Sequence, residues 1–415
     1  MTLKAFFQKV KNASYELPLI RHEVKQQVVR ALADKLLTHT QEVLHHNQLD
    51  LSKMQSDDPK YDRLLLTADR VNAIAQSLKI IAKIESPIWK TLEDFTLPNG
   101  LHLQKKTVPL GVIGIIFEAR PNVTLEAFVL CFMSSNGCIL KGGIDAKNTN
   151  IYLASLIATT LTEHHLPVDC AFLMPHEREM VGELLNATDI VDLIIPRGSQ
   201  ALIDYVKQNT SIPIIETGAG VVHVYVDSSA DIKIAQKVIT NAKTRRVSVC
   251  NALDCLIVHQ AMLMHLPVLV ADLKEKGVHL YLDEPAMNAL SGHYPASLLT
   301  QSTPADYGKE FLSLKLAIKT VENFQDAISH IRQYSSKHSE AIIAQDKHAQ
   351  EMFFMHVDAA VLYANTSTAF TDGGEFGMGG EIGISTQKLH VRGPFSLQHL
   401  VSTKWVVTGD GQVRS

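Results

Sequence analysis

Short apolar runs rich in valine and isoleucine alternate with segments of helical length along most of the chain. The runs at Val108–Phe117, Asp189–Ile195 and His223–Val226 have the composition of buried strands. Segments with helical spacing lie between such runs, for example Gln200–Gln208. Because this alternation is typical of β-α-β units, it predicts a parallel, doubly wound sheet.

A second α/β unit is predicted in the following part of the chain. Ile232–Lys243 and Leu263–Lys276 have helical patterns, whereas Asp254–Val258 and Ala359–Tyr363 have the composition of strands. The chain has 415 residues, which corresponds to two or three domains at roughly 150 residues each. The predicted fold class is therefore α/β, with two doubly wound domains.

The two ends of the chain differ from this pattern. The first ninety residues are predicted to be helical, because apolar residues recur every fourth position from Val24 to Leu36. Residues 93–110 are predicted to form a β-hairpin, since Asn99-Gly100 is a strong turn signal between two alternating segments. A last strand is expected at Lys404–Thr408.

The charge balance argues against some classes of partner. Lys and Arg number 39 against 43 Asp and Glu, a net charge of −4, which does not predict a nucleic-acid or anionic-membrane surface. No apolar run approaches the roughly 20 residues of a membrane-spanning helix. The N-terminal segment also lacks the apolar stretch of a signal peptide. We therefore expect a soluble, cytoplasmic protein with neither a membrane nor a nucleic acid as partner.

The cysteine and histidine patterns predict neither disulfides nor a metal site. Five cysteines in 415 residues are sparse and odd in number, unlike a disulfide framework. The 19 histidines form no H-E-x-x-H pattern and the cysteines no C-x-x-C pair.

Cys250 is a candidate nucleophile. Lys243, Arg245 and Arg246 precede it within seven residues, and inward-pointing cations would favour the reactive thiolate. The alternative is a buried, inert cysteine.

Three other residues stand at the ends of predicted strands, where ligands bind in α/β proteins. Glu216 ends a strand predicted at Pro213–Glu216 and precedes a glycine turn; the alternative is a solvated turn residue. Asn122 follows the strand Val108–Phe117 and is either a donor to an oxyanion or a helix cap. Lys141, followed by two glycines, suits a ribose or phosphate contact.

Six segments occur in an order that resembles one known family over essentially the whole chain: VPLGVIGIIFEARPNVTLEAF, ILKGG, IPRGS, ETGAG, NAKTRRVSVCNA and EFGMGGEIGISTQKLHVRGP. They resemble the γ-glutamyl phosphate reductases, which are glutamate-5-semialdehyde dehydrogenases of proline biosynthesis. More distantly, the chain is similar to the aldehyde dehydrogenase superfamily, in which the catalytic Cys follows a Glu by 34 residues. Cys250 follows Glu216 by the same 34 residues.

The resemblance implies roles for individual residues. It implies that Cys250 is the nucleophile, that Asn122 and the Cys250 backbone N–H donate to the oxyanion, and that Glu216 relays a proton or has a structural role. The implied cofactor contacts are Lys141, Arg197, Gly198, Ser199, Gly218 and Glu310. The implied contacts to the α-amino and α-carboxylate groups of the substrate are Arg120, Ser385, Thr386 and Arg392. For Arg392 a loop salt bridge is an equal alternative.

The chain departs from the family pattern at four positions. Val222 replaces a Cys, Asp254 and Cys255 replace Glu and Thr, and Arg245 stands where Gln is usual. None of these changes removes a group that the chemistry requires. They do put in doubt any role for the Cys that the family has before His223, and for the Glu that Asp254 replaces.

The activity implied by the resemblance is the NADPH-dependent reduction of L-glutamyl 5-phosphate to L-glutamate 5-semialdehyde, through a Cys thioester and with release of phosphate. NADPH is the family's usual cofactor, and the residues alone do not select it over NADH. One alternative is a hydrolytic NAD(P)-dependent aldehyde dehydrogenase, which Glu216 would suit. Another is a non-catalytic homologue.

The resemblance also implies a domain plan, that of an aldehyde-dehydrogenase-like fold. Residues 1–92 and 111–218 are expected to form a cofactor-binding domain and residues 219–388 a catalytic domain. Residues 93–110 and 389–415 are expected to form a small β oligomerisation arm, so that the protein is a homo-oligomer. Glutamate 5-kinase is a candidate partner for handing over the acyl phosphate.

Overall fold

The computed structural model describes residues 2–58 and 60–414. It divides into two units, each described by itself. Unit 1 takes the chain up to Thr217, together with Gly377–Gly383 and the segment from Pro394 onward. Unit 2 takes Gly218–Phe376 and Ile384–Gly393. The roles expected for the domains, cofactor binding and catalysis, remain predictions.

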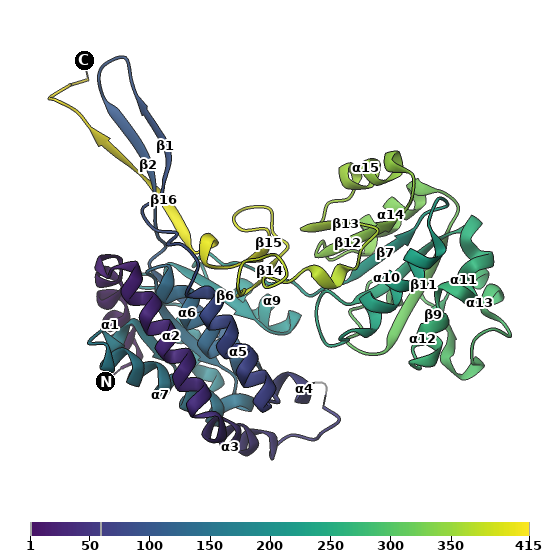
Figure 1. The fold of residues 1–415 in the computed structure, drawn as a ribbon, viewed down its shortest axis with the longest axis horizontal. Helices are drawn as coiled ribbons and strands as arrows, with labels where there is room; N and C mark the ends of the chain where they lie inside the picture. The colour runs from purple at the N-terminus through teal and green to yellow at the C-terminus, as the bar shows by residue number, and fades with distance from the viewer. Residues whose placement is uncertain (1, 59, 415) are drawn as a thin grey trace. The chain divides into compact units, whose positions relative to one another are not determined.

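Unit 1 begins with a layer of helices, as the sequence predicts. They are α1 (Leu3–Glu16), α2 (His22–Thr38), α3 (Thr40–Leu51), α4 (Tyr61–Leu64) and α5 (Ala68–Ile81). Val28 and Leu32, from the apolar face of α2, are fully buried. This face packs against α5, and Figure 1 shows the two helices side by side. Burial of the apolar face supplies most of the stability of such helices.

A parallel sheet of four strands lies beside these helices, in the order β5-β4-β3-β6. The strands are β3 (Val112–Phe117), β4 (Gly137–Gly142), β5 (Ala171–Leu173) and β6 (Leu193–Arg197). The helices between and after them are α6 (Asn122–Met133), α7 (Lys147–Glu163), α8 (Val181–Leu185) and α9 (Gln200–Asn209). Phe117 pairs with both Gly142 and Arg197. The loops that follow β3, β4 and β6 therefore meet at one edge of the sheet.

Three strand predictions in unit 1 need correction. The strand predicted at Asp189–Ile195 begins only at Leu193 and ends at Arg197, because residues 189–192 lie in a turn and bend before it. The run Val108–Phe117 is divided, because residues 108 and 109 belong to the preceding strand and β3 begins at Val112. Pro213–Glu216 is not a strand: Ile214 makes only an isolated bridge to Ile194.

Unit 2 contains a parallel sheet of seven strands in the order β10-β9-β11-β8-β7-β12-β13. The strands are β7 (Val222–Val226), β8 (Leu253–His259), β9 (His279–Leu282), β10 (Leu299–Gln301), β11 (Lys315–Val321), β12 (Ser339–Ile343) and β13 (Val361–Ala364). The helices are α10 (Ile232–Thr244), α11 (Leu266–Leu269), α12 (Ala271–Glu275), α13 (Glu284–Leu290), α14 (Phe324–Tyr334) and α15 (Lys347–His356). The helix predicted at Leu263–Lys276 is broken into short pieces, with Pro267 at the start of α11.

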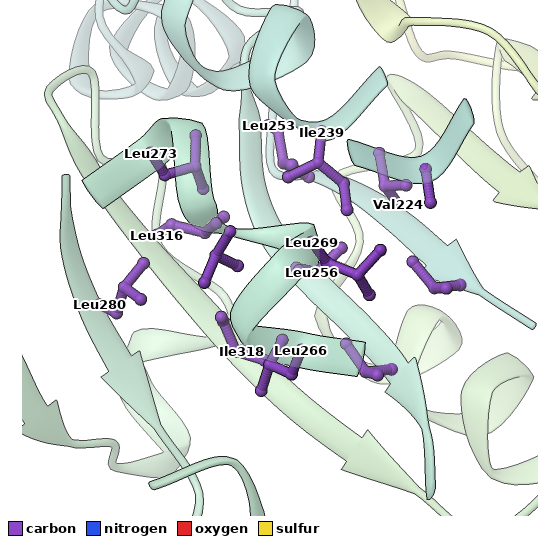
Figure 2. Close-up of a cluster of buried hydrophobic side chains, with 14 of the residues drawn as sticks. Val224, Ile239, Leu253, Leu256, Leu266, Leu269, Leu273, Leu280, Leu316 and Ile318 are labelled. Atoms are coloured by element: carbon purple, nitrogen blue, oxygen red, sulfur yellow. The ribbon is translucent and has the colours of Figure 1, made fainter. Parts of the chain in front are cut away.

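The main core of unit 2 is aliphatic. Strand residues such as Leu256 and Ile318 meet helix residues such as Ile239 and Leu269, and all four are fully buried (Figure 2). Burying each such side chain contributes about 1.5–3 kcal/mol. This packing fixes the ends of the strands, and hence the loops that carry the candidate site.

A three-stranded antiparallel sheet extends from unit 1 (Figure 1). Its strands are β1 (Thr91–Thr96), β2 (His102–Pro109) and β16 (Val401–Thr408). The predicted hairpin is confirmed, with Gly100 at φ +85° in its turn, and the C-terminal strand pairs with β2. A short ribbon, β14 (Gly383–Ser385) with β15 (Gly393–Phe395), lies where the chain passes between the units. Among the described residues, no helix combines the length and the apolar character needed to cross a bilayer.

Candidate active site

Cys250 lies in the loop between α10 and β8 and is partly exposed. The backbone of Gly220 passes directly against it, since a β-carbon at position 220 would overlap the carbonyl oxygen of Cys250. Only glycine therefore allows the two loops to approach this closely.

The residue after Cys250 anchors the loop. Asn251 Nδ2 donates to the carbonyl oxygens of Ala369, at 3.3 Å, and Thr371, at 3.0 Å. Thr368 Oγ1 donates to the carbonyl oxygen of Asn251 at 2.9 Å. These buried hydrogen bonds restrict the backbone on which the thiol is carried.

Of the three upstream cations, Lys243 has a structural task. Lys243 is fully buried, and its Nζ donates to the carbonyl oxygen of Leu253 at 2.8 Å and lies 3.7 Å from Asp254 Oδ1. Asp254 also accepts from the backbone N–H of Phe311 at 3.0 Å. Burial raises the pKa of Asp254 to about 7 and lowers the pKa of Lys243. Asp254, just after the Cys250 loop, thus ties this part of the chain to the segment before β11. Arg245, another of the three upstream cations, is exposed.

Unit 2 brings several of the predicted residues together around this loop. Glu310 Oε1 accepts from the backbone N–H of Gly220 at 3.1 Å. The Thr386 side chain packs beside Gly218, with Oγ1 3.0 Å from the position of a β-carbon there. Cys250, Glu310, Gly218 and Thr386 therefore lie on connected loops of one unit.

Two predicted substrate residues have partners elsewhere in unit 2. Ser385 is fully buried, and its Oγ accepts from the backbone N–H of Gln387 at 3.3 Å. Arg392 Nη2 lies 2.6 Å from Asp358 Oδ1, and Lys388 lies 3.1 Å from the other oxygen. Arg392 and Lys388 hold the pKa of Asp358 down to about 2. The loop salt bridge considered for Arg392 is therefore present.

Asn122, in unit 1, is the first residue of α6. Its Nδ2 donates to Glu126 Oε2 at 2.9 Å. Burial raises the pKa of Glu126 to about 7, although the hydrogen bond from Asn122 opposes this shift. Glu126 was not predicted from the sequence, although its position one helical turn after Asn122 was an available signal.

Arg120 and Arg197 lie near the same carboxyl group, and both lower the pKa of Glu126 against its burial. Arg197 Nη2 is 3.7 Å from Glu381 Oε1. Its Nε is buried and has no hydrogen-bond partner among the described residues. Unit 1 therefore holds an amide donor, two guanidinium groups and two carboxyl groups in one cluster, a suitable arrangement for binding a polar ligand.

A cavity of about 550 Å³ opens at the strand edge of unit 1, within the range of small-molecule sites. Lys141, Gly142, Gly143, Glu118 and Ser199 are among its lining residues. Lys141 is buried, and its Nζ donates to the carbonyl oxygens of Gly142 at 3.2 Å and His176 at 3.1 Å. Burial lowers the pKa of Lys141.

The turn Arg197-Gly198-Ser199 is held against the end of β3. Glu118 accepts from the backbone N–H of Ser199 at 2.8 Å and lies 3.3 Å from its Oγ. A β-carbon on Gly198 would come within 2.6 Å of the Glu118 carboxylate. The cavity thus has the Lys141 side chain at one side and the backbone of Gly142 and Gly143 at another, groups that suit contacts to phosphate or ribose.

Glu216 is paired with Lys207, whose Nζ lies 2.8 Å from Glu216 Oε1. Asn122 and Glu216 belong to unit 1, whereas Cys250 belongs to unit 2. The catalytic roles expected of these three residues remain predictions.

The structure also brings together three residues of metal-ligand type in the core of unit 2, namely His223, Cys255 and His330. They come from three distant segments, so motif spacing could not reveal them. Although burial opposes it, the Glu340 carboxylate raises the pKa of His223 to about 10. Burial lowers the pKa of His330 to about 3.

Comparison with known proteins identifies the family. Residues 2–290 match the model of the aldehyde dehydrogenase family. The chain is 52% identical over 405 residues to the gamma-glutamyl phosphate reductase of Pelodictyon phaeoclathratiforme, covering 98% of this chain and 97% of that protein. It is also 52% identical to the enzyme of that name from Legionella pneumophila strain Lens, covering 97% of each.

A solved structure gives the same result. The crystal structure of gamma-glutamyl phosphate reductase from Thermotoga maritima is 36% identical, with a TM-score of 0.92 and 99% of each chain covered. The expected aldehyde-dehydrogenase-like α/β fold is confirmed. The chain therefore belongs to the aldehyde dehydrogenase family, and within it to the gamma-glutamyl phosphate reductases.

Proposed function

We propose that this protein reduces L-glutamyl 5-phosphate to L-glutamate 5-semialdehyde, with release of phosphate, as a step of proline biosynthesis. The observation that carries the proposal is the similarity to gamma-glutamyl phosphate reductases along nearly the entire chain. The presence of Cys250 in an anchored, partly exposed loop supports it.

In the first half-reaction the Cys250 thiolate attacks the acyl carbon of the mixed anhydride. The new C–S bond forms as the C–O bond to phosphate breaks, which leaves a thioester and free phosphate. Asn122 Nδ2 and the backbone N–H of Cys250 donate to the oxyanion that develops on the carbonyl oxygen. One such donor typically contributes about 10²–10³ in rate.

In the second half-reaction the thioester is reduced. The nicotinamide, when bound, supplies a hydride to the thioester carbon. The oxyanion donors stabilise the resulting tetrahedral thiohemiacetal in the same way. The C–S bond then breaks, and the aldehyde and the Cys250 thiolate are released.

Glu216 has no hydrolytic task in this reaction, because water must not cleave the thioester. Its pairing with Lys207 supports a positioning or structural role over that of a general base.

The cofactor is a nicotinamide dinucleotide, and we propose NADPH. The residues that would hold it are Lys141, Arg197, Gly198, Ser199, Gly218 and Glu310. Arg120, Ser385, Thr386 and Arg392 would hold the α-amino and α-carboxylate groups of the substrate. Unit 1 would then act in cofactor binding and unit 2 in catalysis. The antiparallel sheet of β1, β2 and β16 would form the contact of a homo-oligomer, and glutamate 5-kinase is a candidate donor of the acyl phosphate.

The reverse reaction tests the proposal without the labile acyl phosphate. NADP⁺ reduction is measured with glutamate 5-semialdehyde, with and without inorganic phosphate, for wild type, Cys250→Ala and the buried-thiol control Cys170→Ala. Turnover that requires phosphate and is lost only in the Cys250 variant supports the assignment. Sustained turnover without phosphate assigns a hydrolytic aldehyde dehydrogenase instead.

A further inference from the structure

A row of polar side chains crosses the core of unit 2. Glu340 on β12 pairs in register with His223 on β7, which in turn pairs with Cys255 on β8. All three are fully buried, and α14 places His330 against them. Cys255 belongs to a cluster of buried hydrophobic residues, and the rings of Tyr307 and Tyr334 pack against His330. Burying charged and polar groups is costly unless they are well paired, and the proposed reductase reaction assigns no task to this row.

The atoms that face one another are of metal-ligand type. One ligand atom from each of His223, Cys255 and His330 lies within 4.8 Å of the other two. Cys255 Sγ and His330 Nε2 are 3.5 Å apart. Tetrahedral zinc, with bonds of about 2.0–2.3 Å, places its ligand atoms roughly 3.3–3.8 Å apart. A small inward shift of the side chains therefore closes the site on such an ion.

A second observation concerns the orientation of His223. Its Nδ1 lies 3.1 Å from Glu340 Oε2, and Glu340 also accepts from the backbone N–H of His223 and from Ser335 Oγ. The other ring nitrogen, Nε2, is buried without a hydrogen-bond partner among the described residues. A carboxylate that holds one nitrogen of a histidine while the other faces an ion is the usual arrangement around protein-bound metals.

We propose that His223 Nε2, Cys255 Sγ and His330 Nε2 form a structural site for a borderline-soft divalent cation, with Zn²⁺ as the best match to one thiolate and two imidazoles. The incoming ion displaces two protons, one from the thiol and one from the His223 ring. The net charge of the site therefore stays the same. Of the ion's two positive charges, one balances the new Cys255 thiolate and the other replaces the charge that the His223 ring loses with its proton.

The position of the site gives the ion a defined effect. His223 lies three residues after Gly220, and Cys255 five residues after Cys250. An ion would therefore join β7, β8 and α14 next to the loops that carry the candidate nucleophile. It would act on stability rather than in the reaction, so the proposal stands independently of the reductase assignment.

The test uses the full chain. Because the site is enclosed, the protein is unfolded in guanidinium with a chelator and refolded with one equivalent of ZnCl2 or CoCl2. We expect one ion per chain to be retained after gel filtration and, with Co²⁺, a thiolate-to-metal charge-transfer absorption. The ion should raise Tm by several degrees, since it binds the native state only.

Cys255→Thr removes the soft ligand and keeps a hydroxyl in its place. This variant should lose the charge-transfer band, retain at least tenfold less metal and show no Tm shift. Cys170→Ala, which removes another buried thiol, should behave like wild type. If Cys255→Thr does not fold, His330→Gln is measured in the same way and decides the question.

Three results would overturn the proposal. The first is a wild-type protein that retains no ion after refolding. The second is equal retention and equal Tm shift in wild type and Cys255→Thr. The third is loss of the bound ion in Cys250→Ala alone, which would place adventitious binding at the exposed thiol.

Discussion

Gly220 and Cys250 are in such close backbone contact that any side chain at position 220 would collide with the Cys250 carbonyl group. Gly220 also donates its N–H to Glu310. One glycine thus sets the position of the candidate nucleophile relative to a predicted cofactor residue.

The first prediction follows from this contact. Gly220→Ala must displace the Cys250 loop, and we expect kcat to fall at least a hundredfold, because small misplacements of a reacting group are costly. Gly182→Ala is the matched control, since a β-carbon there meets nothing within 4 Å. Steady-state kinetics and thermal unfolding of both variants check the prediction, and an active Gly220→Ala enzyme would contradict it.

The second prediction concerns the pH dependence of stability. Burial raises the pKa of Glu126 from 4.5 to about 7, so between these values the native state holds a proton that the unfolded state has lost. The contribution of Glu126 to stability is therefore fully present below pH 4.5 and is lost as the pH rises through 7. Glu126→Gln should remove this loss.

The measurement is the free energy of unfolding at about pH 5 and pH 8. Relative to Glu126→Gln, wild type should lose roughly 1–3 kcal/mol over this interval. The control is Glu93→Gln, in the exposed pair with Lys105, for which the difference should stay within a few tenths. Parallel curves for wild type and Glu126→Gln would contradict the burial of a neutral carboxyl group.

The third prediction concerns the cavity of unit 1. Lys141→Ala removes the ammonium group that is held over the cavity by two carbonyl oxygens. We expect the KM for NADPH to rise about tenfold or more while kcat changes less, as for a lost binding contact. Lys90→Ala, at an exposed ion pair, is the control. An unchanged KM would place the dinucleotide elsewhere.

The fourth prediction concerns assembly. Trp405 on β16 is 46% exposed and packs edge-on against Phe95 of β1. Exposed aromatic residues on a small sheet with free edges are typical of a protein contact. Trp405→Glu should therefore shift the protein to smaller species in light scattering, whereas Val413→Glu, beyond the sheet, should not. Equal masses for both variants would argue against this surface.

The sequence predicted elements best where the hydrophobic period was strong. The helix predicted at Ile232–Lys243 ends one residue before the end of α10, and the predicted hairpin formed around Asn99-Gly100. Strand β12 was missed, because its second residue, Glu340, is charged, and a buried carboxylate in a strand is uncommon. It is accommodated by His223 on the neighbouring strand and by the Ser335 hydroxyl, and the contact with His223 is a tertiary one that the hydrophobic period does not reveal.

The family resemblance predicted which residues belong to the candidate site. It did not predict which of them contact one another. Cys250, Glu310 and Thr386 lie on connected loops of unit 2. Lys243 was one of three cations that would favour the thiolate if they pointed toward it, but it is bound to Asp254, a partner 11 residues later. Glu126 and the cluster of His223, Cys255 and His330 depend on packing between distant segments, which a motif search does not detect.

The most direct test of the central claim is a single-turnover reaction with glutamate 5-semialdehyde and NADP⁺ in the absence of phosphate. The thioester route predicts a burst of one NADPH per chain and an acyl group on Cys250, located by mass spectrometry of its peptide. Added phosphate should then discharge the acyl group and restore turnover. Steady turnover without phosphate, or a burst that persists in Cys250→Ala, would contradict the account.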